Sequence, residues 1–565
     1  MNAVAGRRGL SPLLWIVIAL IVLAAIAWLA GAFDGWRGRG APARAGIYVG
    51  AFQVCSQPTA PIPAGFDFPQ PEGTVAQWVQ QGNEARAREH GWFVWAGLNS
   101  ATGAGPVWRT WCTSTQAFTG EGSAAMAASH AIGGRLSLGA RRRAVGGAAQ
   151  AGEDPISFPV SPVYTLPAAV LNNPAYQQAG CIRPATSGIP AALNDGPTLE
   201  SNGDIMVAGV VYNDSAFNSI RGQNLYQPAT LERMLPAPGQ QQPNWPRLAA
   251  NSVALKPMMW PVPQTGYWAL PVWDNLESDN GAYSGFEISG QWRRAVAVSA
   301  ETPAAGTRDV SLLTNGGIAL NGAPLGPNLY PGAPVHSIDE FYGFQPDLAS
   351  MTPCDRAILD ASSYWAYNRP FQQGDYLIVV AMHIMTREQA DWTFQSVWWH
   401  DRPDAGPFAA NRPDIPGAPG PWRHYLMTST YGFQGPPGPR GPQWPIAYNP
   451  YIELAANHPI RTNCMNCHHR AAAPGEPPPP APSPPWPVGS YEAGRLMCGA
   501  PVPDALDVYA QDNAIFNSLL LVDSIWSISD RVPVSRSGAA AAGPRPGASA
   551  ASCPSAARAG APRRR

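Results

Sequence analysis

Apolar and polar positions divide the chain into regions with different periods, and the first region is apolar throughout. Residues 10–33 form an uncharged run of 24 residues behind Arg7 and Arg8. A helix of that length crosses a hydrocarbon core of about 30 Å. We therefore predict a membrane anchor over residues 1–33. A cleaved signal peptide with the small residues "AGA" at 30–32 is the alternative, and either one exports the rest of the chain.

The next region has a helical period and is followed by strand-like runs. Between residues 73 and 100, Val75, Trp78 and Val79 share one face of a helix. Residues 124–154 contain few large apolar side chains and are typical of an insertion or loop. Beyond about residue 160 the β-branched and aromatic residues gather in short runs bounded by turn residues, at 203–214, 252–263, 266–273, 375–385 and 391–401.

These runs predict the fold class. They follow one another without regular helices between them, which favours antiparallel sheets over a parallel α/β core. We predict a mainly β protein with some α structure: a β-sandwich-like body, a helical N-terminal portion and a C-terminal segment packed on the body. Pro257 and Pro261 predict that the run 252–263 is an edge strand, because proline cannot donate to a sheet ladder.

Composition and charge limit the function. Lys plus Arg total 37 and Asp plus Glu total 38, so no basic field exists to bind nucleic acid. The single lysine is Lys256. Twenty-one Trp and eighteen Tyr supply large apolar area and indicate a folded body.

The predicted export determines how the cysteines are interpreted. Outside the cytoplasm, spare pairs form structural disulfides, and the candidates in the body are Cys55, Cys112, Cys181, Cys354 and Cys498. Their connectivity cannot be deduced from one sequence. Cys553 lies in an Ala/Gly/Pro/Ser/Arg-rich tail, which the composition predicts to be disordered.

The stretch "RTNCMNCHHR" at 461–470 carries the candidate chemistry. In C-x-x-C-H the two thiols add to the vinyl groups of one haem, and the following histidine ligates its iron. Cys464, Cys467 and His468 therefore predict one covalent haem c. A zinc site would want a second Cys or His pair at finger-like spacing, a redox dithiol would want a βαβ context, and a plain disulfide would give His468 no role.

A sixth iron ligand is less determined by the sequence. Met497 follows a Pro-rich spacer at 473–487 that is long enough to carry the chain round the haem edge, and it is our predicted distal ligand. His458, His469, Met427 and His424 are the alternatives. Residues 512–529 have the spacing of an amphipathic helix opened by Asp512.

Other tempting residues have ordinary interpretations. His383 and His400 lie in strand-like runs and are interpreted as structural, and Trp392, Trp398 and Trp399 as core. No nucleotide-binding, nucleophile-elbow or zinc-protease motif occurs in the chain. No catalytic residue is assigned.

Several segments stand in a characteristic order over residues 70–530: "HGWFVWAGLN", "PVWRTWCTSTQAF", "HSIDEFYGF", "GDYLIVVAMHIMTREQADWTFQSVWWHD", "NPYIE", "TNCMNCHHRAA" and "DSIWSI". This order resembles a family of uncharacterised bacterial exported proteins, often labelled cytochrome c family proteins, which carry one C-terminal haem-attachment motif. The resemblance implies a haem and an exported location, and no substrate.

These observations together predict six segments: the anchor at 1–33, a linker and entry segment at 34–72, a helical and loop portion at 73–160, the β-rich body at 161–445, the haem c segment at 446–532 and the disordered tail at 533–565. We predict a monohaem c-type cytochrome in the bacterial inner membrane, with one N-terminal span and its body in the periplasm. It would exchange electrons with a periplasmic or membrane-bound redox partner protein. A haem-dependent oxidoreductase with an open distal site, or a β-sandwich sensing module with a structural haem, are the alternatives.

Overall fold

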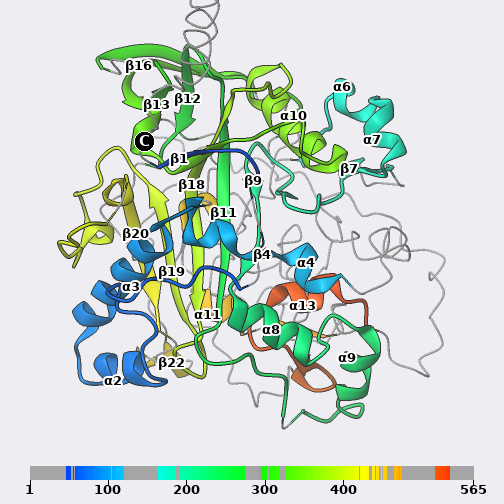
Figure 1. Ribbon diagram of the computed structural model, residues 1–565, viewed down its shortest axis with the longest axis vertical. Coiled ribbons are helices and arrows are strands. Elements are labelled where there is room, and N and C mark those ends of the chain that lie inside the picture. The colour runs from blue at the N-terminus through cyan, green and yellow to red at the C-terminus, as the bar shows by residue number, and fades with distance from the viewer. Residues whose placement is uncertain are drawn as a thin grey trace, which may run out of the picture. The chain divides into compact units, whose positions relative to one another are not determined.

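A computed structural model of the chain describes residues 46–534 apart from internal gaps (Figure 1). The gaps are 53–54, 56–57, 104, 120–162, 186–190, 243, 274–291, 293, 302–304, 319–325, 419, 432–434, 439–440, 444–446, 448, 455–463, 470 and 474–515. The predicted insertion at 124–154, most of the Pro-rich spacer and the tail from 535 onward lie outside the described residues.

The largest sheet has ten strands, and two long ones run side by side at its centre (Figure 1). β18 (Tyr376–Thr386) is buried along its whole length, which explains its near-continuous apolar sequence, since both of its faces are covered. It pairs antiparallel with β11 (Val253–Val262), β19 (Thr393–Trp399) and β17 (Gly343–Gln345). The other strands of this sheet are β1 (Ile47–Val49), β4 (Cys112–Thr113), β8 (Glu200–Ser201), β9 (Val207–Ala208), β10 (Val211–Tyr212) and β20 (Tyr425–Thr430).

A second sheet of four strands has the order β12 (Tyr267–Pro271), β13 (Ala295–Ser299), β16 (Asn328–Ser337) and β14 (Thr307–Leu312). Two-stranded ladders complete the β structure: β2 (Ala101–Thr102) with β3 (Gly105–Pro106), β5 (Val163–Tyr164) with β15 (Gly317–Ile318), β6 (Ile182–Arg183) with β7 (Ala192–Leu193), β21 (Gly435–Gly438) with β22 (Gly441–Gln443), and β23 (Ala472–Ala473) with β24 (Leu520–Leu521). The strands predicted at 252–263, 266–273, 375–385 and 391–401 are confirmed.

The helices are short, and the two longest described ones begin with a side-chain cap. Asn83 caps α3 (Glu84–Leu98), and Thr352 caps α10 (Pro353–Tyr367). The helical prediction for 73–100 is confirmed by α3 and α2 (Thr74–Gln80). The other α-helices are α4 (Ser114–Phe118), α6 (Ala168–Leu171), α7 (Pro174–Gln178), α8 (Asp214–Gly222), α9 (Pro228–Met234), α11 (Cys464–His468) and α13 (Trp526–Arg531), and shorter turns of other helix types are η1 (Val107–Thr110), η4 (Ile338–Glu340), η5 (Pro407–Ala409), η6 (Trp422–His424) and η7 (Pro450–Leu454). The fold is mixed α/β with a sheet-rich body, consistent with the predicted mainly β class.

β11 is an interior strand, so the edge prediction from its prolines is wrong. β18 pairs with one side of it, and β9 and β10 pair with the other. The Pro257 carbonyl accepts the Gly209 N–H at 3.2 Å, in the break between β9 and β10. The Pro261 carbonyl accepts the Tyr367 hydroxyl at 2.8 Å, toward α10. Because the nitrogen and oxygen of one strand residue point to the same side, neither missing N–H falls where a neighbouring strand needs it.

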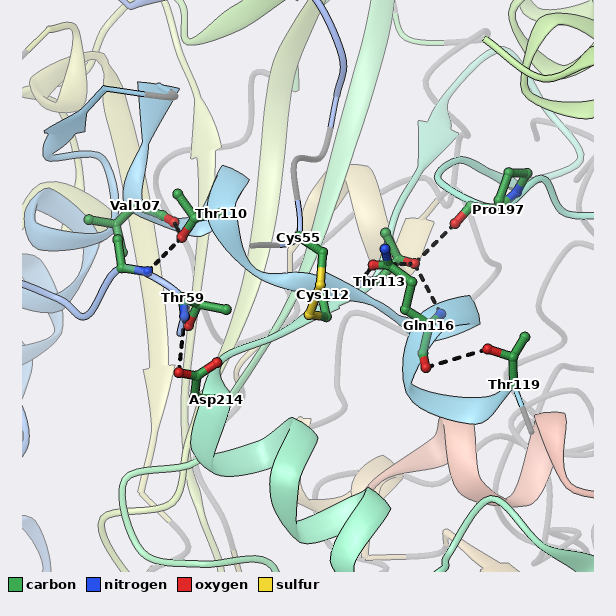
Figure 2. The surroundings of a disulfide bond; sticks show 11 residues. Cys55, Thr59, Val107, Thr110, Cys112, Thr113, Gln116, Thr119, Pro197 and Asp214 are labelled. Carbon is green, nitrogen blue, oxygen red and sulfur yellow. Dashed lines mark hydrogen bonds between the residues drawn. A yellow bond between two sulfur atoms is a disulfide. The ribbon is translucent and has the colours of Figure 1, made fainter. Parts of the chain in front are cut away.

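In the described part of the chain, two disulfides join segments distant in sequence, as the prediction of structural disulfides requires. Cys181 and Cys354 are bonded across 173 residues, and Cys55 and Cys112 across 57. Figure 2 shows the second bond beside β4, where Thr113 caps α4 through a capping box. The Thr59 N–H donates to Asp214 at the start of α8 at 3.0 Å. The Cys55–Cys112 disulfide therefore links the entry segment to β4, at one margin of the large sheet.

The C-terminal segment differs from its prediction. A single helix over 512–529 is wrong, because Ser518, Asp523 and Ser524 have left-handed backbones with φ of 69°, 51° and 65°. β24 pairs with β23 within this segment, and only α13 is helical. The Asp523 carboxylate accepts the Leu248 N–H at 2.8 Å, a tertiary contact that stabilises the turn.

A buried ionic network lies where α3 meets the end of β18. His90 Nδ1 lies 3.1 Å from Asp67 Oδ2, and His90 Nε2 lies 3.0 Å from Glu388 Oε2. Burial opposes the charged imidazole, but the charges and hydrogen bonds of the two carboxylates outweigh it and raise the pKa of His90 to about 9. Thr386 donates to Glu388 at 2.7 Å and Arg86 to Asp67 at 2.7 Å. Every ionic group in this network therefore has a partner.

The membrane prediction is corrected by the helices. Over the described ranges no helix is long and apolar enough to cross a membrane. The longest described helices, α3 and α10, have 15 residues each, about 22 Å at 1.5 Å per residue. We accordingly do not retain three predictions: membrane attachment through an N-terminal helix, the bacterial inner-membrane location with a periplasmic body, and the redox partner there. The segment 10–33 itself lies outside the described residues.

Candidate functional site

The C-x-x-C-H stretch forms a short helix. α11 spans Cys464–His468, so positions 464, 467 and 468 are spaced i, i+3 and i+4 and lie on one helix face. Cys464 and Met465 are buried, and the Cys464 Sγ lies 3.7 Å from the Ala447 carbonyl oxygen. The side chain of Cys467 is outside the described part. The backbone thus presents both cysteine positions and the histidine to the same side.

His468 is held by one hydrogen bond to the backbone. Its Nδ1 lies 2.8 Å from the Ser524 carbonyl oxygen. A carbonyl only accepts, so Nδ1 carries the proton and Nε2 keeps a lone pair. Ser524 follows Asp523, whose carboxylate also accepts Arg387 Nε at 3.3 Å. Because these contacts stabilise the left-handed turn, the Ser524 carbonyl holds the imidazole in one tautomer.

Aromatic rings surround the His468 imidazole. The His383 ring lies 5.2 Å away in a near-parallel arrangement, at 24°. Phe394 lies 4.8 Å away and Trp526 6.5 Å away, as distances between ring centroids. Burial and the charge of Lys256 lower the pKa of His468 to about 4, against the opposing effect of the Ser524 bond. The imidazole is therefore neutral near pH 7, the form that ligates metals.

The surface beneath His468 is a hydrophobic cluster built from distant segments. β10, β18, β19, α11 and the segment around α13 contribute to it, with Tyr212, Met385, Trp392, Phe394, Cys464, Met465, Leu520, Ile525 and Ile528 among its buried members. Such surroundings exclude water from a bound group and favour its less charged redox state.

The predicted site residues have different outcomes. Cys464 and His468 occupy this site, whereas Met497 and His458 lie outside the described residues and remain predictions. Met427 belongs to the larger hydrophobic core, and His424 Nδ1 lies 3.4 Å from Glu340. His469 lies 4.0 Å from Asp391. In the described structure the rings that contact His468 belong instead to His383, Phe394 and Trp526.

Sequence reasoning missed three residues of the site. His383 was interpreted as structural because it sits in an apolar strand, and its contact with His468 depends on tertiary packing. Ser524 was placed in a helix, although its carbonyl fixes His468. Lys256 was noted only as the single lysine, and it pairs directly with His383 across β11 and β18. Only the rarity of lysine in this chain could have drawn attention to the position.

The prediction that the protein is metal-binding is corrected by the described side chains. Across the described ranges, no three His, Cys, Asp or Glu side chains are grouped so that they could hold a metal ion. The physical reason is visible at His468, whose described ring neighbours are one further histidine and two apolar aromatics. Such a set lacks the three or four donors that a bare ion requires.

Comparisons with known proteins leave the site to be judged on its own chemistry. No protein-family model, curated protein or solved structure matches the chain. What the site can do therefore follows from its donors: one neutral imidazole with a free lone pair, one buried thiol, a second cysteine position on the same helix face, and an apolar surround.

Proposed function

We propose that this chain is a c-type haem protein that carries one covalent haem and transfers single electrons. The haem would be attached through Cys464 and Cys467, with His468 Nε2 as a ligand of its iron. The observation that carries the proposal is the bond from His468 Nδ1–H to the Ser524 carbonyl, which leaves the lone pair on Nε2, on the side of the ring away from that carbonyl. A bound haem would supply reversible one-electron chemistry between ferric and ferrous iron.

The donor set fits such a group. A porphyrin brings four nitrogen ligands with it, so its iron needs only one or two side chains, unlike a bare ion. Positions 464, 467 and 468 share a helix face, as attachment along one haem edge requires. Phe394 and Trp526 beside the imidazole would cover an apolar macrocycle and keep water away. Met497 stays our candidate for the distal ligand.

The finer architecture belongs to the same proposal. We infer that the two main sheets form a sandwich-like body and that the haem segment packs on it. The shared cluster of Cys464, Met465, Trp392 and Phe394 supports that packing. Likewise, the resemblance to bacterial cytochrome c family proteins with one haem-attachment motif is carried here as an inference from the segments quoted above.

The test is a haem-stained denaturing gel after expression with a cytochrome c maturation system. Wild-type chain should keep the stain, and Cys464→Ser/Cys467→Ser should lose it, because no thioether remains to hold the haem under denaturing conditions. Cys181→Ser/Cys354→Ser is the matched control, since it removes a cysteine pair elsewhere and should stain. Equal staining of both double variants would overturn the proposal.

A carbon monoxide difference spectrum then separates electron transfer from the alternatives. Six-coordinate iron with two protein ligands should bind carbon monoxide slowly or not at all, whereas the oxidoreductase and sensing alternatives have an open site that binds it at once. Rapid, stoichiometric binding by the reduced protein would replace electron transfer with one of those alternatives.

A further inference from the structure

A polar row crosses the large sheet at the point where His468 rests on it. Lys256 on β11 pairs with His383 on β18, and His383 pairs with Ser396 on β19. Side chains of directly paired residues project from the same face of a sheet. The His468 ring stacks on the middle member of this row. Three polar side chains therefore line up on the face that carries the candidate site.

The hydrogen bonds around Asn449 determine where His383 carries its proton. Asn449 Oδ1 accepts the Tyr451 N–H at 3.0 Å, while Asn449 Nδ2 donates to the Val397 carbonyl at 2.9 Å and to Ser396 Oγ at 3.0 Å. Ser396 thus accepts from Asn449, and in the described structure its own hydroxyl proton has one acceptor within reach, His383 Nδ1, 3.2 Å away. We infer that Ser396 donates to His383, because the reverse direction would leave the hydroxyl proton unpaired as well as Nε2. The neutral His383 ring consequently carries its hydrogen on Nε2.

Among the described residues, that Nε2–H donor has no acceptor. His383 is 7% exposed, and its Nε2 is buried without a hydrogen-bond partner in the part of the chain that the structure describes. Buried donors in folded proteins are nearly always paired, so an orphaned one calls for an explanation. His468 is no acceptor for it at the observed stacking, since no hydrogen bond joins the two rings.

The surroundings select the charge of the missing acceptor. Lys256 lies directly opposite His383 in the antiparallel ladder of β11 and β18, so its ammonium-bearing side chain projects from the same sheet face as His383. A donor beside an ammonium in an apolar cluster suits a negatively charged oxygen.

We propose that His383 Nε2–H and the Lys256 ammonium bind a carboxylate-like anion beside His468. Two sources have this chemistry: a propionate of the covalent haem, or a free small carboxylate. The first source rests on the proposed function, whereas the site itself does not. In either case His383 is a binding residue and not merely structural.

The experiment follows histidine side-chain nitrogens by NMR in the full-length, ¹⁵N-histidine-labelled chain, with acetate as the probe. In the haem-free Cys464→Ser/Cys467→Ser chain, added acetate should shift the His383 Nε2–H resonance in a saturable manner, which identifies a free-anion site. In the haem-loaded chain, a resonance already shifted before acetate is added, and insensitive to it, identifies a propionate. The control is His400, whose Nε2 lies 2.8 Å from the Trp273 carbonyl and whose Nδ1 accepts the Arg402 N–H at 2.9 Å. It should not respond.

Variants of Lys256 and His383 show whether acetate binding depends on the charge of a side chain or on its shape. Lys256→Met should weaken acetate binding about tenfold or more, as loss of a charge-assisted contact does, while Lys256→Arg should stay within about threefold. His383→Gln retains an N–H near the same position and should retain part of the affinity. If the haem-free double variant does not fold, the position of the His383 Nε2–H resonance in the haem-loaded chain is compared between wild type, Lys256→Met and Lys256→Arg, and only Lys256→Met should change it. A His383 resonance that is unshifted in both the haem-free and the haem-loaded chain, or one that moves no more than that of His400, would overturn the proposal.

Discussion

His90 and His383 are two buried histidines associated with the same strand, and they are satisfied in opposite ways. His90 has a carboxylate on each ring nitrogen, and those carboxylates raise its pKa to about 9. Among the described residues, His383 has one neutral hydroxyl partner and a ring nitrogen without a partner, and burial, followed by the charges of His468 and Lys256, lowers its pKa. Burial alone therefore does not distinguish a structural histidine from a functional one. Complete pairing marks His90 as part of the scaffold, and the missing acceptor marks His383 as part of a site.

The comparison predicts its largest effect at His90. His90→Leu leaves Glu388 buried without a cationic partner, so we expect a loss of about 3–5 kcal/mol in the free energy of unfolding. Urea denaturation followed by tryptophan fluorescence measures it. The double variant His90→Leu/Glu388→Leu should recover much of the loss, because both charges are then gone. A single-variant loss below about 1 kcal/mol would contradict the structural role.

The same residue predicts a pH dependence with a definite sign. Since the folded-state pKa of His90 is raised to about 9 from an unfolded value near 6.5, its contribution is complete below about pH 6.5 and is lost as pH rises through 9. The difference in unfolding free energy between wild type and His90→Leu should shrink by roughly 3 kcal/mol over that interval. His400 has the opposite sign, because burial lowers its pKa to about 4 and its contribution is lost as pH falls from 6.5. A flat difference between pH 6 and 9.5 would exclude the ionic reading of His90.

His383 should contribute little to stability. An unpaired buried donor destabilises the folded state by about 1–3 kcal/mol. His383→Phe removes that donor, and the stability recovered offsets the loss of the Ser396 bond and the altered packing. We expect a net change within about 1 kcal/mol, measured by the same urea titration, together with loss of the acetate response. A destabilisation equal to that of His90→Leu would show that both histidines are structural.

The smallest effect is expected at an exposed ion pair. Arg423 and Asp414 lie 2.8 Å apart with side chains 49% and 90% exposed. Asp414→Asn should change the free energy of unfolding by less than about 0.5 kcal/mol, since solvent screens such pairs. This change in unfolding free energy is the reference for judging the His383→Phe result. A larger loss would contradict the expectation that solvent screens the Arg423–Asp414 pair.

The secondary structure was predictable where local pattern decides it. β18, β19 and α3 follow from continuous or periodic apolar residues and from turn and cap residues at their ends. The edge prediction for β11 failed because its accommodation of Pro257 depends on Gly209, which is distant in sequence. The helix expected at 512–529 failed because Asp523 bonds to Leu248 and Arg387, and neither contact is visible in a local pattern.

The residues of the candidate site likewise fall into those that local sequence predicts and those that only tertiary contacts reveal. Cys464, Cys467 and His468 were readable because their chemistry requires fixed spacing within five residues. His383, Lys256 and Ser524 were not readable, because strand register and a left-handed turn bring them to the site. Sequence therefore predicted the residues that would attach a cofactor, and only the structure identified those that would orient and surround it.

The most direct test of the central claim is the mass of one tryptic peptide. Cleavage after Arg461 and Arg470 releases residues 462–470, "TNCMNCHHR", which contains both cysteines and His468. In protein matured with a cytochrome c assembly system, we predict this peptide at its own mass plus one haem, with fragment ions that retain the haem on Cys464 and Cys467. The unmodified peptide mass, or a disulfide between the two cysteines, would contradict covalent haem attachment.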